Sequence, residues 1–232
     1  MAHWQHRDEL KWSEFRFNQP YAKGLNQFKE EILGKADFDP AVLWQWGTMQ
    51  SMAVIAVLKS CEVVFGQEGQ KVVQDALREV GRDVGRQILN GTKLPKDMKP
   101  IEFISFYATV INRIVYASIE NPRIDGEDRA SFDIVWCPHQ TTYTPFDCRV
   151  QRYFVQGMID AAEEHVKGLR FEVRFDSTIP AGAQTCHFTL WRGKTDETSA
   201  WNEYTKQLEA KAIDIARREA KTGKSGAKSD TS

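Results

Sequence analysis

The chain has 232 residues, of which 41% are hydrophobic and 27% charged, a composition typical of a soluble globular protein rather than a disordered, collagenous or coiled-coil chain. Its 31 lysines and arginines nearly balance 32 aspartates and glutamates, so no strong net field draws the protein to nucleic acid or to an anionic membrane. A chain of this length buries enough surface to fold without disulfides or a structural metal. We therefore expect one folded domain over residues 1–220.

The cysteine count and the N-terminal residues favour a cytoplasmic protein. Four cysteines are too few for a disulfide-stapled secreted scaffold, and Met1–Leu10 lacks the basic start and apolar middle of an export signal. The longest apolar run, Met52–Leu58, is far shorter than the roughly 20 residues of a membrane helix, so we expect no membrane span. Residues 221–232, rich in Lys, Ser and Gly, predict a disordered tail.

Helical periodicity dominates the first half of the chain, about residues 1–118. Glu68–Asn90 has apolar residues every three or four positions, with charged residues between them and Gly91 as a stop, which predicts a surface helix. Met49–Phe65 is apolar almost all round, which predicts a helix buried in the core. After the turn-rich link Gly91–Pro100, a further helix places five apolar residues on one face: Ile101, Ile104, Ala108, Ile111 and Val115.

The period changes to that of strands in the second half, about residues 119–220. Ser131–Cys137 alternates apolar and polar residues after an Asp125-Gly126 turn signal, which indicates the second arm of a hairpin. Leu169–Phe175 also alternates, and Thr185–Trp191 is apolar and aromatic on both faces. These segments predict an antiparallel sheet of three or four strands.

Two helices flank these strands. Thr144, followed by a proline and, at the third position, Asp147, is a typical helix start, and that helix should run to about Lys167. A last helix is expected over about Glu197–Ala220. The predicted fold class is α+β, with an N-terminal helical layer packed on a C-terminal antiparallel sheet and its flanking helices.

Three cysteines lie at the ends of predicted elements in the second half, while the motifs typical of nucleotide, metalloprotease, esterase and thioredoxin-like sites are absent from the sequence. Cys148 falls in the first turn of a predicted helix, where free N–H groups and the macrodipole favour a thiolate and lower its pKa. Alternatively, the Cys148 side chain packs inward and serves only as an apolar contact. Cys137 ends a strand, and Cys186 shares a strand face with core residues, so packing is the alternative for both.

His139 lies two residues from Cys137 in a predicted loop. A histidine in this place is suited to act as a base toward a thiol or a water molecule. The alternative is an exposed loop histidine without a role.

The order of these residues resembles the C-terminal half of the L-2-amino-thiazoline-4-carboxylic acid hydrolase family. The resemblance consists of a strand that ends in Cys137-Pro138, Cys148 at the start of the next helix, and a closing Gly-x-x-x-Cys-x-Phe element within Ile179–Phe188. It covers about residues 100–192. More distant vinyl-reductase-type ligand-binding domains have a similar cysteine order.

The resemblance implies hydrolytic opening of a carbon–nitrogen bond in a small cyclic amidine, lactam or related amide. A cysteine would attack the sp2 carbon, a histidine or water would move the proton, and an arginine would hold a substrate carboxylate as a two-point fork. No cofactor and no metal is expected. The candidate residues are Cys137, Cys148, Cys186 and His139 for catalysis and Arg149, Arg152 and Arg192 for substrate binding.

Two other interpretations stay open. The vinyl-reductase-like resemblance implies a non-catalytic module that binds a small molecule or a metal, with the three cysteines as soft ligands and His139 as a fourth. The third interpretation is a helical interaction protein whose cysteines are all core. We expect a small-molecule partner, no nucleic acid and no membrane, and leave a homo-oligomer open.

Overall fold

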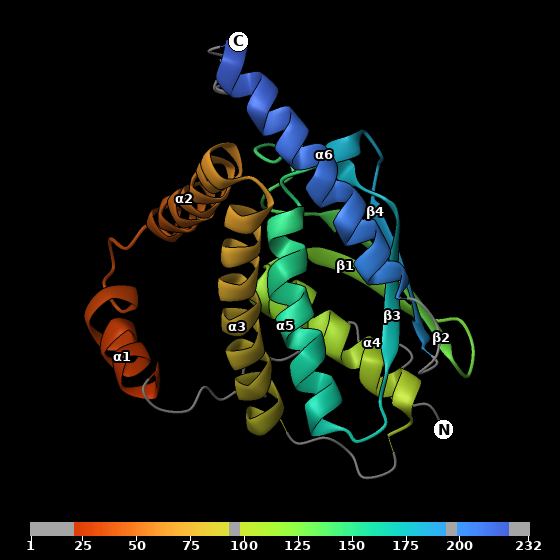
Figure 1. Ribbon diagram of the computed structural model, residues 1–232. Helices are drawn as coiled ribbons and strands as arrows, with labels where there is room; N and C mark the ends of the chain where they lie inside the picture. Colours follow the sequence, from red (N-terminus) through yellow and green to blue (C-terminus); the bar gives the residue numbers. More distant parts are fainter. Residues whose placement is uncertain (1–20, 93–97, 194–198, 223–232) are drawn as a thin grey trace.

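The computed structural model describes residues 21–92, 98–193 and 199–222, and the predicted α+β fold is confirmed (Figure 1). The helices of the first half are α1 (Tyr21–Phe28), the π-helical turn η2 (Lys29–Leu33), α2 (Ala41–Phe65), α3 (Gln67–Gly91), α4 (Pro100–Val110) and the π-helical turn η3 (Ile111–Val115). The second half contains β1 (Ile119–Ile124), β2 (Arg129–Trp136), α5 (Arg149–His165), β3 (Phe171–Ser177), the 3-10 turn η4 (Ile179–Ala181), β4 (Cys186–Arg192) and α6 (Ala200–Thr222). Of the predicted disordered tail, residues 221 and 222 are helical, and the rest lies outside the described residues.

The four strands form one antiparallel sheet in the order β1-β2-β4-β3. β1 and β2 are the predicted hairpin. Strand alternation turns Phe132, Phe188 and Leu190 to the inner face, where they join α4 and α5 in the main core. The opposite face is polar, and there His187 Nδ1 lies 2.7 Å from Asp133 Oδ1. The core therefore lies between the inner face of the sheet and the helical layer.

Two glycines allow α3 and α5 to approach until their backbones touch. A Cβ atom on Gly157 of α5 would overlap the carbonyl oxygen of Arg78, and one on Gly81 of α3 would overlap the carbonyl oxygen of Phe154. Neither position accepts a larger residue without moving a helix. The two helices run side by side in Figure 1.

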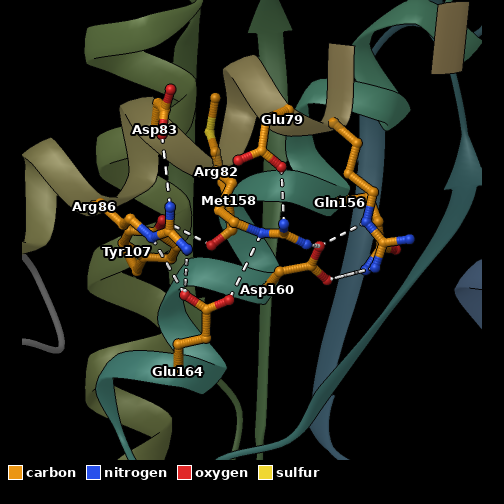
Figure 2. Close-up of polar contacts among 10 residues, drawn as sticks. Glu79, Arg82, Asp83, Arg86, Tyr107, Gln156, Met158, Asp160 and Glu164 are labelled. Carbon is orange, nitrogen blue, oxygen red and sulfur yellow. Dashed lines mark hydrogen bonds and ion pairs between the residues drawn. The ribbon is translucent and has the colours of Figure 1, made fainter. Parts of the chain in front are cut away.

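Ion pairs border this close contact on its solvent side (Figure 2). Arg78 Nε lies 2.6 Å and Arg82 Nη2 3.0 Å from Asp160 Oδ2, and Arg86 Nη2 lies 3.0 Å from Glu164 Oε2. The charged residues that sequence periodicity assigns to the surface of α3 therefore bind the neighbouring helix. They hold the pKa of Asp160 below its usual range through hydrogen bonds and charge, against the raising effect of burial.

The prediction that Met49–Phe65 lies buried in the core is wrong. Within α2 only Ile55, Leu58 and Glu62 are buried. Its exposed large apolar side chains are Val42, Leu43, Trp44, Trp46, Met49, Met52, Val57, Val63, Val64 and Phe65. The physical reason is that α3 and α6 contact one side of α2, and no described element covers the other. By length and composition α2 is also able to cross a membrane, with 17% of its apolar window buried, which is weak evidence taken alone.

The start of α5 also differs from the prediction. Thr144 does not cap the helix; its hydroxyl donates instead to Asp147 Oδ2 over 2.8 Å, and its backbone N–H donates to the same oxygen over 2.9 Å. These bonds close a separate turn, and α5 begins at Arg149. Cys148 therefore stands just before the helix rather than inside its first turn.

Candidate functional site: an apolar cavity between helices and sheet

A cavity of about 120 Å³ lies between the inner face of the sheet and helices α4, α5 and α6. Its lining surface is almost entirely apolar. α4 and η3 contribute Tyr107, Ala108, Ile111 and Asn112, the sheet contributes Phe132, Ile134, Phe171, Val173, Phe175, Cys186, Phe188 and Leu190, and α5 and α6 contribute Val155, Ile159 and Trp201. The inner faces of the predicted strands thus form one wall of this cavity.

Five of the seven predicted site residues line this cavity. They are Cys137, His139, Cys148, Arg152 and Cys186, which come from the end of β2, the loop after it, α5 and β4. The structure therefore brings together three thiols and an imidazole that are up to about fifty residues apart in the chain. Arg149 and Arg192 are not among the lining residues.

Burial keeps all three cavity cysteines in the thiol form at neutral pH. It raises the pKa of Cys148 to about 12, and the nearby Cys186, Cys137 and Asp147 raise it further while Arg152 lowers it. The pKa values of Cys137 and Cys186 are also raised, mainly by burial. The prediction that a helix start lowers the pKa of Cys148 is therefore wrong, because desolvation exceeds the effect of the helix end. Cys186 Sγ in addition accepts a hydrogen bond from the Ile179 backbone N–H over 3.2 Å.

His139 forms part of the cavity wall rather than an exposed loop. Its ring stacks on that of Tyr143, with centroids 4.5 Å apart and an angle of 14° between the planes. Burial lowers the pKa of His139, so the imidazole is neutral at pH 7 and keeps one nitrogen as an acceptor.

Arg152 is a buried cation in the wall of the cavity, and the residue is 2% exposed. Its Nε donates to Thr205 Oγ1 over 3.0 Å and its Nη2 to the Trp201 carbonyl over 2.8 Å, while Nη1 is buried without a hydrogen-bond partner. The guanidinium carbon lies 3.7 Å from the centre of the Trp201 ring and is also close to the rings of Phe175 and Tyr204. Burial lowers the pKa of Arg152 to about 9, so the group is still a cation at neutral pH.

The other two predicted arginines have different environments. Arg149 is 1% exposed and forms a two-point ion pair with Glu62 of α2, with its Nη2 2.6 Å from Glu62 Oε2 and its Nε 3.0 Å from Oε1. Gln70 Nε2 donates to the same Glu62 Oε1 over 2.6 Å. Arg192 is exposed at the end of β4. Arg149 is thus occupied in joining α2 to α5, and neither residue reaches the cavity.

Sequence reasoning missed the wall that α4 supplies. Tyr107 and Ala108 line the cavity, and Asn112 follows them in η3. A signal existed, since Ile101–Ile111 is apolar around most of its circumference and nearly every residue in it is buried. We assigned that segment to the helical layer packed on the sheet, as the structure has it, but did not name its residues as part of a site.

Among the described residues, no group of three or more His, Cys, Asp and Glu side chains is placed to hold a metal ion. The cysteines and His139 share one cavity without forming a ligand set. The donor chemistry of this site is therefore that of neutral thiols and a neutral imidazole in apolar surroundings.

No protein-family model matches the chain. An uncharacterized protein of Archaeoglobus fulgidus is 49% identical over 217 residues, which cover 91% of this chain and 96% of that protein. Among solved structures, a trafficking protein particle complex subunit 3 from Naegleria fowleri, covalently bound to palmitic acid, overlaps 62% of this chain and 96% of its own at 12% identity and a TM-score of 0.36. An overlap this weak supports no inference about fold or ligand.

Proposed function

We propose that this chain, which belongs to the same family as the Archaeoglobus fulgidus protein, binds a small and mostly apolar molecule in the cavity between the sheet and the helices. The observation that carries the proposal is the cavity itself, lined almost entirely by carbon atoms of aromatic and aliphatic side chains. Ligand sites of soluble proteins have this composition, with a few polar groups that set the orientation of the ligand.

The size of the cavity limits the ligand. Its volume of about 120 Å³ is close to that of the engineered cavities of about 150 Å³ that stay dry and accept one benzene molecule. A single ring or a short branched chain fits without rearrangement. Larger molecules require the lining side chains to move.

Arg152 and His139 are the basic residues of the cavity wall, which also contains the neutral polar residues Asn112, Ser118, Gln151 and Thr178. A ligand that carries a carboxylate or another acceptor would supply a partner for the free Nη1 of Arg152 and for a cation that has no direct ion pair among the described residues. The expected class is thus a small apolar acid. A neutral molecule of the same shape would fill the cavity without this interaction.

Isothermal titration calorimetry with isovalerate and the neutral 3-methyl-1-butanol, both short branched chains, tests both points. We expect isovalerate to bind and 3-methyl-1-butanol to bind about tenfold more weakly, since a charge-assisted hydrogen bond contributes about 1.5 kcal/mol or more. Equal affinities for the two probes would show that Arg152 does not contribute to binding. The proposal that the cavity binds a small apolar molecule would still stand.

A filled cavity is the matched control. Val155→Phe places a ring in the cavity and should abolish binding of both probes, whereas Val80→Phe makes the same change at a position of α3 that is 52% exposed and should leave binding unchanged. Thermal unfolding of both variants verifies that they fold. If neither probe binds the folded wild-type protein, the proposal fails.

Hydrolysis of a small cyclic amidine, lactam or related amide is the second candidate function. It is favoured by one observation, the shared cavity of Cys137, Cys148, Cys186 and His139. A cysteine would form a bond to the sp2 carbon, the ring nitrogen would leave with a proton, and water would then release the product. Because the three thiol pKa values are raised, His139 would have to accept the thiol proton as the bond forms.

Assay of 2-aminothiazoline-4-carboxylate hydrolysis tests this candidate. If it holds, Cys148→Ser or Cys137→Ser abolishes turnover, and Cys61→Ser on α2, outside the cavity, has no effect. Absence of turnover with this substrate and with simple lactams would leave the binding proposal as the better description. We also propose a cytoplasmic location, where a reducing environment maintains the four cysteines as free thiols.

A further inference from the structure

An apolar stripe, in which the exposed Ser60 is the one polar position, runs along the exposed side of α2. Its members follow one another at intervals of three, four or seven residues, opposite the buried Ile55 and Leu58. We call it the outer stripe of α2, and it consists of Val42, Trp46, Met49, Ala53, Val57 and Val64. The five larger side chains are between 53% and 67% exposed. Figure 1 shows α2 on the side of α3 away from the sheet, with α1 beyond it.

The exposed apolar area is that of one half of a protein interface. The stripe presents on the order of 600 Å², and the exposed Leu43, Met52 and Val63 beside it bring the apolar surface to on the order of 800 Å². One partner in a standard protein interface buries about 800 Å², whereas the largest apolar patch of an ordinary monomer is about 300–600 Å². Trp and Met are also residue types enriched in interface cores.

The charges of α2 point away from the stripe. The helix has only two charged residues, Lys59 and Glu62. Lys59 Nζ lies 3.1 Å from Asp147 Oδ1, and Glu62 is paired with Arg149, so both are bound to the body of the protein. The stripe itself is uncharged from end to end.

These charges argue against a membrane as the occupant. Helices that lie on a membrane carry exposed Lys and Arg beside the apolar face, and α2 has none free for that purpose. A spanning α2 would have to break its buried pair with Arg149 or carry that pair into lipid. The net charge of −1 provides no attraction to anionic lipids either.

We propose that the outer stripe of α2 binds the same stripe of a second copy of this chain. The interval between successive apolar residues is that of helices that pack along one another in pairs. An uncharged stripe is self-complementary, as a two-fold interface requires, because no like charges meet. In such a pair the central residue of the stripe, Ala53, lies next to Ala53 of the other copy.

Sedimentation equilibrium of the full chain at micromolar concentration tests the dimer. The wild type should have twice the monomer mass of 26.6 kDa. Met49→Glu combined with Val57→Glu places charges in the stripe and should raise the dimer dissociation constant by about 100-fold or more. The control, Val72→Glu, adds a charge at a valine of α3 that is 69% exposed and should leave the dimer intact.

A cross-link tests the geometry independently of stability. In a Cys61→Ser background, oxidised Ala53→Cys should form a disulfide-linked dimer, and the control Val72→Cys should not. A monomeric wild type overturns the proposal, and so does a dimer unaffected by the two glutamates. If the monomer floats with phosphatidylglycerol–phosphatidylcholine vesicles and the glutamate variant does not, the occupant is a membrane and the proposal is equally overturned.

Discussion

α2 and α3 are consecutive helices of 25 residues each, and their environments are the reverse of what their compositions suggest. α3 is strongly charged, yet its backbone touches that of α5 at two glycines and its arginines bind the acids of that helix. α2 is mostly apolar, yet only three of its residues are buried. An apolar composition therefore does not by itself bury a helix, whereas small residues allow two helices to approach closely.

α2 is held to the body by a small apolar cluster, in which Ile55 and Leu58 pack with Tyr143, Val150 and Tyr153, and by one buried ion pair. Glu62 and Arg149 are both almost fully buried, and Gln70 of α3 also binds Glu62. Lys59 adds a contact to Asp147 near the surface. In contrast, α3 is fixed to α5 along most of its length. The variants below test whether this difference is energetic as well as geometric.

The largest effect should come from breaking the pair that anchors α2. Glu62→Gln leaves the Arg149 guanidinium buried with less negative charge beside it, and it should lower the free energy of unfolding by about 3–5 kcal/mol in urea titrations. Replacing both residues by Met should cost clearly less than this single change. The exposed pair Lys71–Asp75 is the control, and Asp75→Asn should change stability by no more than about 0.5 kcal/mol.

The next effect concerns the close contact of α3 and α5. Gly157→Ala places a methyl group against the carbonyl oxygen of Arg78 and 2.6 Å from the Arg82 nitrogen, so the helices have to separate. The expected loss is about 1–3 kcal/mol of unfolding free energy. Thermal and urea unfolding measure it. A neutral result would mean that the two helices tolerate a wider spacing, which would contradict our view of this contact.

A smaller effect should follow from the ion pairs of the same two helices. Asp160→Asn removes the carboxylate that Arg78 and Arg82 share, and should cost about 1–2 kcal/mol at pH 7. Because the folded pKa of Asp160 is lowered, its stabilisation is present above the unfolded pKa of about 3.9 and is lost as pH falls through the folded pKa. In urea titrations from pH 7 to acid pH, the difference in unfolding free energy between the wild type and Asp160→Asn should therefore become smaller. A difference that stays constant with pH would show that the Asp160 carboxylate charge is not its cause.

The smallest change in stability is expected at Gly47 of α2, because the space around this glycine is open. A Cβ atom on Gly47 would meet nothing within 4 Å, unlike one on Gly157. Gly47→Ala should therefore stabilise the protein by about 0.5–1 kcal/mol, because alanine loses less conformational freedom in a helix. Urea titration of this variant beside Gly157→Ala measures the difference between the two positions, and a loss of stability in both would show that the two helices are equally constrained.

Much of the fold could be predicted because it depends on local patterns. The predicted strands Ser131–Cys137, Leu169–Phe175 and Thr185–Trp191 overlap β2, β3 and β4 with ends shifted by two residues at most. Alternation also placed Cys186 on the face of Phe188 and Leu190, and all three line the cavity. Patterns of period two and 3.6 are properties of the backbone, so they can be recognised without knowing the partner of any element.

The candidate site was only partly predictable. Four of its residues were named from their positions at element ends or in the loop between them, and Arg152 only from the family resemblance. Arg149 was assigned to a substrate on the same ground and instead binds Glu62, 87 residues earlier. A pair so far apart leaves no sign in local sequence. The pKa of Cys148 is a similar case, since it depends on how many atoms from other elements exclude water from the thiol.

The helices and strands, the antiparallel hairpin and the inward faces of the strands could be predicted from sequence, because each depends on the spacing of apolar residues along one segment. The uncovered side of α2, the cavity that α4 closes against the sheet and the neutral state of its three thiols could not be predicted in this way. The physical reason is that burial, and with it charge state and the space left between elements, depends on which surfaces meet.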